Sequence, residues 1–157
     1  MVKKLSPGKF EYPLETVLKV RGIRERKEQE QFADKKREYL DEKNKEETIE
    51  QKKKKSATEL QNLLGGGKIN DFERVVRRRI HFGLVKEELD KQIEKVIEAS
   101  SNLEGQRQKL MDAMKNRKII EKDKEHKLEE YSEMMKQLEI KFMDDIATAR
   151  HQMDKKS

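Results

Sequence analysis

A heptad pattern of apolar residues runs through the second half of the chain, from Phe72 to about Met153. Spacings that alternate between four and three residues keep one narrow stripe on one side of an α-helix. The two expected series of stripe positions are Leu89, Val96, Leu103, Leu110, Arg117, Lys124, Tyr131, Leu138 and Asp145, and Ile93, Ser100, Arg107, Met114, Glu121, Leu128, Met135, Phe142 and Ala149. No proline interrupts them, and the residues between them are mostly charged or amide side chains. Since a globule cannot bury so narrow a stripe, the pattern predicts a long helix packed along another helix.

The composition supports linear packing rather than a thick core. Of the 157 residues, 45% are charged and only 32% are apolar. Such a composition is typical of long helices and coiled coils, although it is also compatible with disorder. Disordered segments do not keep a heptad phase, so the persistent pattern favours helix. The net charge of +6 comes from interleaved signs, which is more typical of a solvated helix surface than of a nucleic-acid interface.

The first half of the chain predicts a partner helix. Pro13 suits the first turn of a helix, and helix-forming residues continue to Leu64. Three glycines, at positions 65–67, then permit a sharp reversal, and Asn70 or Asp71 is suited to cap the next helix, with Glu73 available for a capping box. We therefore expect an all-α fold, a long antiparallel two-helix coiled-coil hairpin. Its expected parts are an irregular arm (1–12), a first helix (13–64), a glycine turn (65–70) and a second helix (71–153), together forming one domain.

The two helices differ in length, so the second should overhang the first. If Leu64 faces Asp71 across the turn, Leu14 lies opposite Glu121, and the second helix continues for about 30 residues, or roughly 45 Å. Apolar stripe residues continue into this overhang, namely Leu128, Tyr131, Met135, Leu138 and Phe142. Folding back of Phe10 and Tyr12 would cover only its beginning. An overhang with an apolar stripe predicts a binding partner.

Sites for catalysis or metal binding are not expected. The segment Gly65–Lys68 resembles a phosphate loop only superficially, because Ile69 replaces the required Ser or Thr and a helix precedes the segment. The three histidines are far apart in the sequence, and the absence of cysteine excludes thiolate zinc sites and disulfides. We expect a non-enzymatic protein without a cofactor or a metal. No apolar leader or membrane-spanning run is evident, so we also expect a cytoplasmic protein without direct membrane insertion.

The segment from Val75 to Leu89 is unusual because its apolar residues nearly encircle the helix and Arg77–Arg79 lie among them. These residues either close the tip of the hairpin over the end of the first helix or form a docking patch. A two-helix tip cannot bury apolar groups on every side, so we expect Phe82, Leu84 or Val85 to be partly exposed.

The segment from Phe10 to Arg21 (FEYPLETVLKVR) resembles the opening of the flagellar export protein FliJ family, in which an aromatic residue and Pro-Leu-Glu precede a helix bearing leucine and arginine. The length and the long hairpin are also similar to that family. The resemblance implies a hairpin that enters the hexameric type III export ATPase and promotes its assembly. It also implies contacts with the export-gate membrane protein and with flagellar substrate chaperones, at a location peripheral to the inner-membrane export apparatus. By position, Phe82, Val85 and Leu89 match the residues of the family that contact the gate and the chaperones.

From the overhang and the resemblance together we predict which end enters the ATPase ring. The expected ring contacts are Arg21, Arg24, Leu128, Tyr131, Met135, Leu138 and Phe142. Two alternatives remain open, and the second has the weaker sequence support. One is an injectisome stalk or a generic coiled-coil adaptor, and the other is a nucleic-acid-binding hairpin that uses Arg77–Arg79 and Lys52–Lys55, although no nucleic-acid partner is expected.

Overall fold

The computed structural model describes residues 9–65 and 71–156, and these residues form two helices. Helix α1 spans Glu15–Leu64 and helix α2 spans Phe72–Lys155. The described ranges contain no strand, so the prediction of an all-α fold is confirmed. The predicted turn begins at Gly65, directly after α1, while Gly66 and Gly67 lie outside the described residues.

Local hydrogen bonds define the helix ends on both sides of this turn. The backbone amide of Gly65 donates to the carbonyl oxygen of Gln61 at 2.8 Å and completes the last turn of α1. At the start of α2, the Asp71 Oδ1 accepts a hydrogen bond from the backbone amide of Arg74 at 3.1 Å. Asp71 is therefore the N-cap, as the sequence suggested. A capping box with Glu73 does not accompany this cap, because the residue three positions after Asp71 is Arg74.

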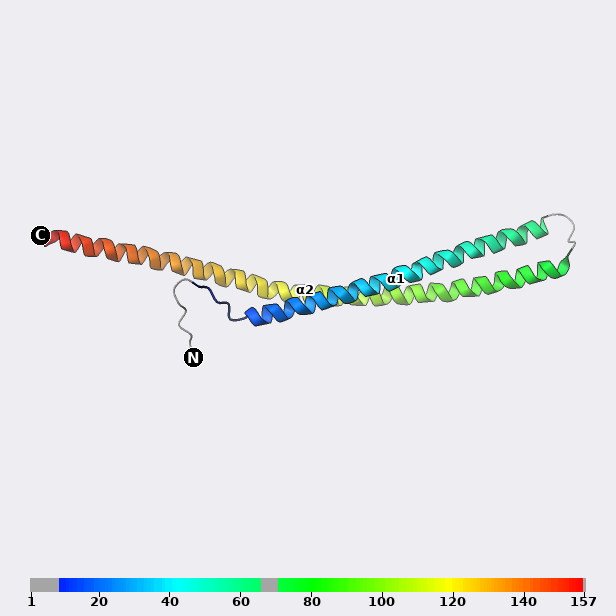
Figure 1. Cartoon of the computed structure of the whole chain (residues 1–157), viewed down its shortest axis with the longest axis horizontal. Helices are drawn as coiled ribbons and strands as arrows, with labels where there is room; N and C mark the ends of the chain where they lie inside the picture. Colours follow the sequence, from blue (N-terminus) through cyan, green and yellow to red (C-terminus); the bar gives the residue numbers. More distant parts are fainter. Residues whose placement is uncertain (1–8, 66–70, 157) are drawn as a thin grey trace. The chain divides into compact units, whose positions relative to one another are not determined.

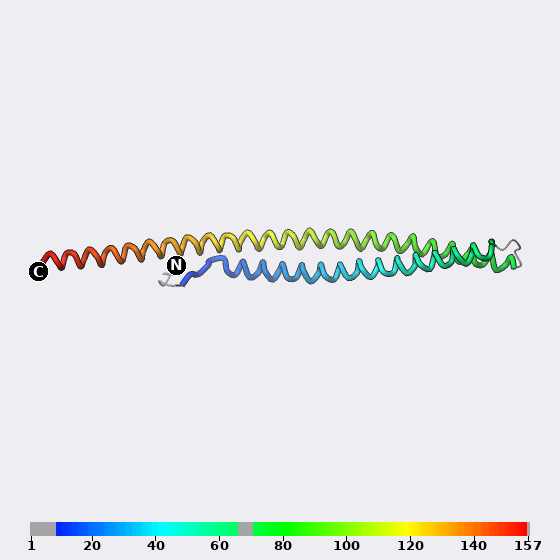
Figure 2. Tube along the Cα trace, turned by 90° about the horizontal axis from the view of Figure 1, so that it is seen from above, coloured from blue at the N-terminus to red at the C-terminus, as the bar shows by residue number. Residues whose placement is uncertain are grey.

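Contacts divide the chain into two units, each of which pairs a part of α1 with a part of α2. Unit 1 contains the chain up to Glu25 and the chain from Asp112 onward, and unit 2 is Arg26–Met111. Within unit 2, the cyan part of α1 lies beside the green part of α2 in both Figures 1 and 2, with opposite chain directions. Within unit 1, the blue start of α1 lies beside the yellow part of α2. The predicted antiparallel two-helix hairpin is therefore confirmed.

The apolar core of unit 2 is thin and lies along the line where the two helices meet. In α2, Val85, Leu89 and Val96 are buried, and Leu103 and Leu110 are half-buried. Leu89, Val96, Leu103 and Leu110 belong to the first predicted series of stripe residues, which is confirmed in this unit. Val85 is an additional buried residue that neither series contained. From α1, the half-buried Phe32, Tyr39 and Ile49 lie at heptad-compatible positions, but charged residues occupy many of the intervening ones.

The second predicted series of stripe residues is wrong in unit 2 by one position. Ile93 and Arg107 are exposed, whereas Gln92 and Gln106 are buried. The stripe steps three residues, not four, from Leu89 to its next buried position. The sequence pattern pointed to Ile93 because it is apolar. The buried positions are instead occupied by Gln92 and Gln106, whose amides hydrogen-bond to α1.

Two equivalent amide contacts join the helices of unit 2. Gln92 Nε2 donates to the carbonyl oxygen of Glu42 at 2.9 Å and to its carboxylate Oε2 at 2.5 Å. Gln106 Nε2 donates in the same way to Glu28, at 3.2 Å and 2.5 Å. The two contacts are two heptads apart in both helices, so they define the same antiparallel alignment. The predicted alignment placed each glutamate within one residue of its observed glutamine.

Unit 1 is held by an aromatic and ionic anchor at the start of α1. The buried Tyr12 donates its phenolic hydrogen to the Asp123 carboxylate of α2, and the carbonyl oxygen of Ile120 lies 3.4 Å from the hydroxyl. Glu15 pairs with Lys124 at 2.8 Å. These contacts fix where α1 begins along α2, and α2 continues beyond them to Lys155. The predicted overhang of the second helix is thus confirmed.

Candidate functional site

The overhanging part of α2 presents an exposed apolar surface in unit 1. We call it the C-terminal stripe and define it as Leu128, Tyr131, Met135, Leu138, Phe142 and Ile146. Spacings of three or four residues keep these side chains on one side of the helix. Leu128, Leu138 and Phe142 are exposed, and the exposed fraction reaches 64% at Phe142. A contiguous exposed apolar surface of this kind marks a site where a partner binds.

Among the described residues of the N-terminal arm, Phe10 covers the beginning of the stripe. The ring of Phe10 lies 5.5 Å from the ring of Tyr131, centre to centre, with a tilt of 48° between the planes. Tyr131 and the following stripe residue Met135 are half-buried. Phe10 and Tyr12 therefore fold back onto the start of the overhang, as expected.

Charged groups near the start of α1 are largely engaged within unit 1. Arg21 Nη1 donates to the carbonyl oxygen of Asn116 at 2.7 Å. Arg117 hydrogen-bonds to the carboxylate of Glu25, and this bond is the main cause that raises the pKa of Arg117. Arg24 is exposed. Of the two arginines predicted to contact an ATPase ring, Arg24 is thus the more accessible.

The environment of Tyr12 disfavours ionisation of its hydroxyl group. Burial, followed by the hydrogen bond to Asp123 and the negative charges of Asp123 and Glu15, raises the pKa of Tyr12 to about 12. Each of these causes disfavours the phenolate. Tyr12 therefore keeps its proton and acts as a hydrogen-bond donor that anchors the arm.

The predicted docking trio near the tip of unit 2 lies mostly inside the hairpin. Val85 is 2% exposed and Leu89 is 7% exposed, whereas Phe82 is half-buried. As components of an open surface, Val85 and Leu89 are therefore incorrectly predicted, because they face α1 in the thin core. Leu84, which the sequence also offered as an exposed residue of this segment, is 59% exposed.

Sequence reasoning missed an apolar row on the outer side of this segment. Phe72, Val76, Ile80 and Leu84 are all exposed and follow one another at intervals of four residues. We call these four residues the outer row. Its spacing was readable from the sequence, but which face of α2 points away from α1 was not.

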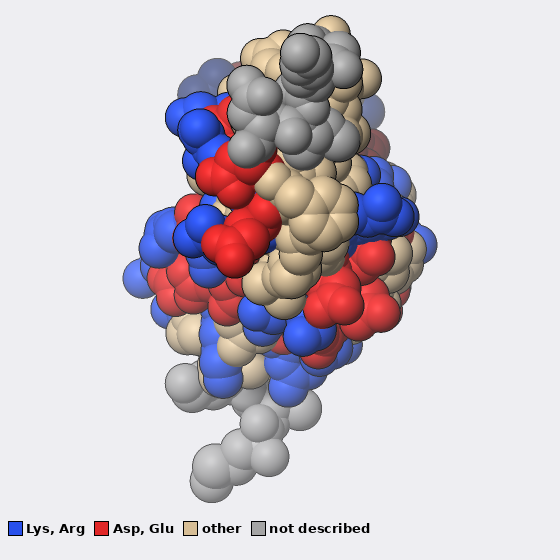
Figure 3. Space-filling view, turned by 90° about the vertical axis from the view of Figure 1, so that its right-hand side faces the viewer, with Lys and Arg blue, Asp and Glu red and all other residues tan. Residues whose placement is uncertain are grey.

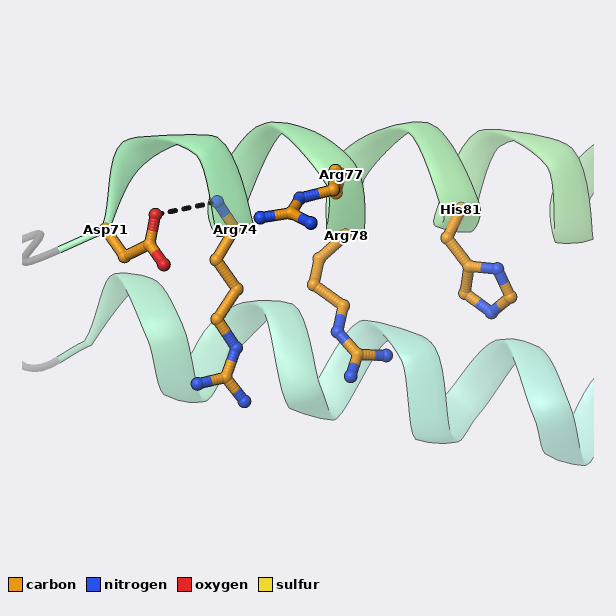
Figure 4. Close-up of a pocket in the computed structure, with 5 residues that line it drawn as sticks. All are labelled: Asp71, Arg74, Arg77, Arg78 and His81. Carbon is orange, nitrogen blue, oxygen red and sulfur yellow. Dashed lines mark hydrogen bonds between the residues drawn. The ribbon is translucent and has the colours of Figure 1, made fainter.

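Basic side chains cluster beside the outer row. Figure 4 shows Arg74, Arg77, Arg78 and His81 around a shallow surface hollow with Asp71, and Arg74, Arg78 and His81 extend toward α1. Arg78 Nη1 forms an ion pair with Glu59 of α1 at 2.8 Å. With three arginines and a histidine around it, the hollow is suited to binding.

No group of three His, Asp or Glu side chains within the described ranges is arranged to hold a metal ion. Neither α1 nor α2 contains a stretch long and apolar enough to cross a bilayer. The segment that resembled a phosphate loop lies almost entirely outside the described residues.

The fold and these surfaces define a helical-hairpin binding protein, with a thin mixed seam and apolar groups exposed at both ends of α2. The family model described as flagellar FliJ protein matches residues 10–156, so the chain belongs to the FliJ family.

One solved structure is similar in fold. It is a protein described as a YscO homologue from Chlamydia trachomatis, with a TM-score of 0.64 and 22% sequence identity. The alignment covers 95% of this chain and 99% of the other. No curated protein shows a significant match to the chain.

Proposed function

We propose that the chain is a non-catalytic coiled-coil stalk of the flagellar type III export ATPase complex. In this role, the hairpin enters the ATPase hexamer, promotes its assembly and activity, and links it to the export gate and to substrate chaperones. Family membership supports the export system as the setting. The observation that carries the stalk role is the C-terminal stripe, which α2 exposes beyond the start of α1.

The stripe is suited to a partner that surrounds a helix. A single helix that leaves Leu138 and Phe142 exposed gains free energy when other subunits remove this surface from water. Met135 adds a flexible and polarizable side chain that adapts to several neighbours. The exposed Arg24 supplies a cation near the base of the overhang, so part of the interaction should weaken as salt is added.

The link to the export-gate membrane protein and to the chaperones rests on the family. Within the matching trio, Phe82 is partly accessible, while Val85 and Leu89 would become accessible only if the helices separated at the tip. We therefore propose that Phe82 contacts these partners directly and that Val85 and Leu89 support the helix beneath it. Gate binding should then be more sensitive to a polar substitution at Phe82 than to one at a distant exposed residue.

A matched pair of substitutions tests the stalk role. Phe142 and Ile140 have nearly equal exposed fractions, 64% and 62%, but lie on opposite sides of the same helix. Phe142→Asp should reduce the stimulation of the purified flagellar export ATPase by about fivefold or more, as expected for an interface anchor. Ile140→Asp introduces the same charge outside the stripe and should leave the stimulation near the level of the unmodified chain.

Circular dichroism of both variants controls for helix content. Equal stimulation by the two variants would show that the stripe does not contact the ATPase. An injectisome stalk has the same mechanics, so stimulation of an injectisome ATPase but not of the flagellar enzyme would favour that alternative.

A further inference from the structure

The outer row forms an apolar face that the hairpin leaves uncovered. Phe72, Val76, Ile80 and Leu84 are 39% to 72% exposed, and each lies one helical turn from the next. Val85, which packs toward α1, lies on the other side of α2. Successive residues rotate by about 100° around a helix, so the outer row is centred opposite the buried seam. Helix α1 therefore does not obstruct access to this face.

Cations border the outer row on both sides. By the same rotation, Arg79 and Lys86 lie along one edge of the row and Arg77 lies along the other, while two exposed acidic residues, Glu73 and Glu87, lie on the face itself. The three cations are exposed, and Arg77 forms an ion pair with the neighbouring Glu73 at 3.9 Å. Figure 3 looks onto this end of the molecule and shows uncharged surface with Lys and Arg groups on either side, together with some acidic groups.

The positive charge of the chain is concentrated in this region. Residues 52–86 contain ten Lys and Arg and three Asp and Glu, which gives a net charge of +7. The whole chain has a net charge of +6, so the remaining residues together are slightly acidic. Elsewhere the positive and negative side chains are interleaved, as on an ordinary solvated surface. Residues 52–86 differ because their net charge is strongly positive and because they include exposed apolar side chains.

We propose that the outer row and its bordering cations bind the surface of an anionic phospholipid bilayer. An exposed apolar face with basic residues along its edges is the arrangement of a helix that lies in the membrane interface. The apolar side chains enter the boundary between headgroups and acyl chains, and the cations meet the lipid phosphates. Because α2 is already folded against α1, binding does not require the ordering of a new helix. The helix lies on the membrane and does not span it.

Other polyanions explain less of the surface. Nucleic acid would use the cations but has no need for four apolar side chains on the face between them. An acidic protein groove would use both, and the vesicle experiment below distinguishes it from a bilayer, because binding to such a groove needs no lipid. The proposal goes beyond the stalk role and does not depend on it, because no ATPase takes part in the interaction.

Vesicle cosedimentation of the full-length chain tests the proposal. One vesicle sample is phosphatidylcholine alone, and the other contains about one-third phosphatidylglycerol. We expect binding to the anionic vesicles that falls with added salt, and little binding to the neutral ones. Ile80→Asp should weaken this binding by about tenfold or more, because it removes an apolar anchor and adds a negative charge. Arg77→Gln should weaken it by about fivefold.

Matched controls separate this site from general electrostatic attraction. Ile97 is 63% exposed on the same helix, compared with 59% for Ile80, so Ile97→Asp introduces the same change outside the outer row. Arg107→Gln, at another exposed position, is the control for Arg77→Gln. Binding that responds equally to Ile80→Asp and Ile97→Asp would overturn the proposal. So would an absence of binding to anionic vesicles, or equally strong binding to heparin that Ile80→Asp leaves unchanged.

Discussion

The contact between Gln106 and Glu28 gives a quantitative prediction about the hairpin of unit 2. Gln106 is 6% exposed, and its Nε2 donates to a backbone carbonyl oxygen at 3.2 Å and to a carboxylate at 2.5 Å. Gln106→Ala removes both hydrogen bonds. A neutral hydrogen bond contributes about 1 kcal/mol, and one to a charged group about 1.5–3 kcal/mol. The sum is about 2.5–4 kcal/mol. We expect a smaller loss of about 2 kcal/mol, because the Glu28 side chain is half-exposed and regains hydrogen bonds with water.

Gln108→Ala is the matched control. Gln108 lies two residues away on the same helix and is exposed, so its substitution makes the same change in helix propensity outside the seam. Urea denaturation followed by circular dichroism gives the free energy of unfolding of each variant. With an m-value of about 2 kcal/mol per M, the transition midpoint of Gln106→Ala should lie about 1 M below that of Gln108→Ala. Midpoints that coincide would refute the view that buried amide contacts hold the two helices in alignment.

Three further predictions concern individual side chains. Tyr12 should ionise near pH 12 in an ultraviolet titration, whereas an unfolded tyrosine ionises near pH 10. The stability of unit 1 should therefore fall as the pH rises between these two values, and Tyr12→Phe should abolish that loss. The hydrogen bond from Gln92 is the main cause that lowers the pKa of Glu42 from 4.5, so the stability advantage of the unmodified chain over Gln92→Ala should be full above that pH and shrink on acidification. Val85→Ala should cost about 2 kcal/mol in urea denaturation, whereas Val76→Ala, at an exposed position, should cost less than about 0.5 kcal/mol; equal costs would contradict the assignment of Val85 to the core.

Much of the architecture follows from the sequence because periodicity and chain reversal are local properties. The heptad series through Leu89 and Val96 predicted a helix that needs a partner, and the glycines after Leu64 predicted where the chain turns back. Once the turn is placed, residue counting alone aligns the helices and predicts the overhang. The FEYPLETVLKVR segment further connected the chain to an export family, which the match over residues 10–156 establishes.

Only the tertiary structure decided which face of α2 meets α1. Ile93 and Gln92 are neighbours on the helix, and hydrophobicity alone favours burying Ile93. The amide of Gln92 is buried instead because α1 offers an acceptor carbonyl and carboxylate from Glu42 at that position. A sequence pattern shows only how hydrophobic each residue is. Whether a buried amide finds a hydrogen-bond partner depends on where the second helix lies.

The rotation of α2 also explains why Val85 and Leu89 were expected on an exposed surface but are buried. The sequence showed that apolar residues encircle α2 between Val75 and Leu89, and it predicted that some of them must be exposed. It did not determine that Val85 packs inward while Ile80 and Leu84 point outward, because that choice depends on the rotation of α2 about its own axis. Periodicity determines which residues share a face, and only packing against α1 determines which face is left for a partner.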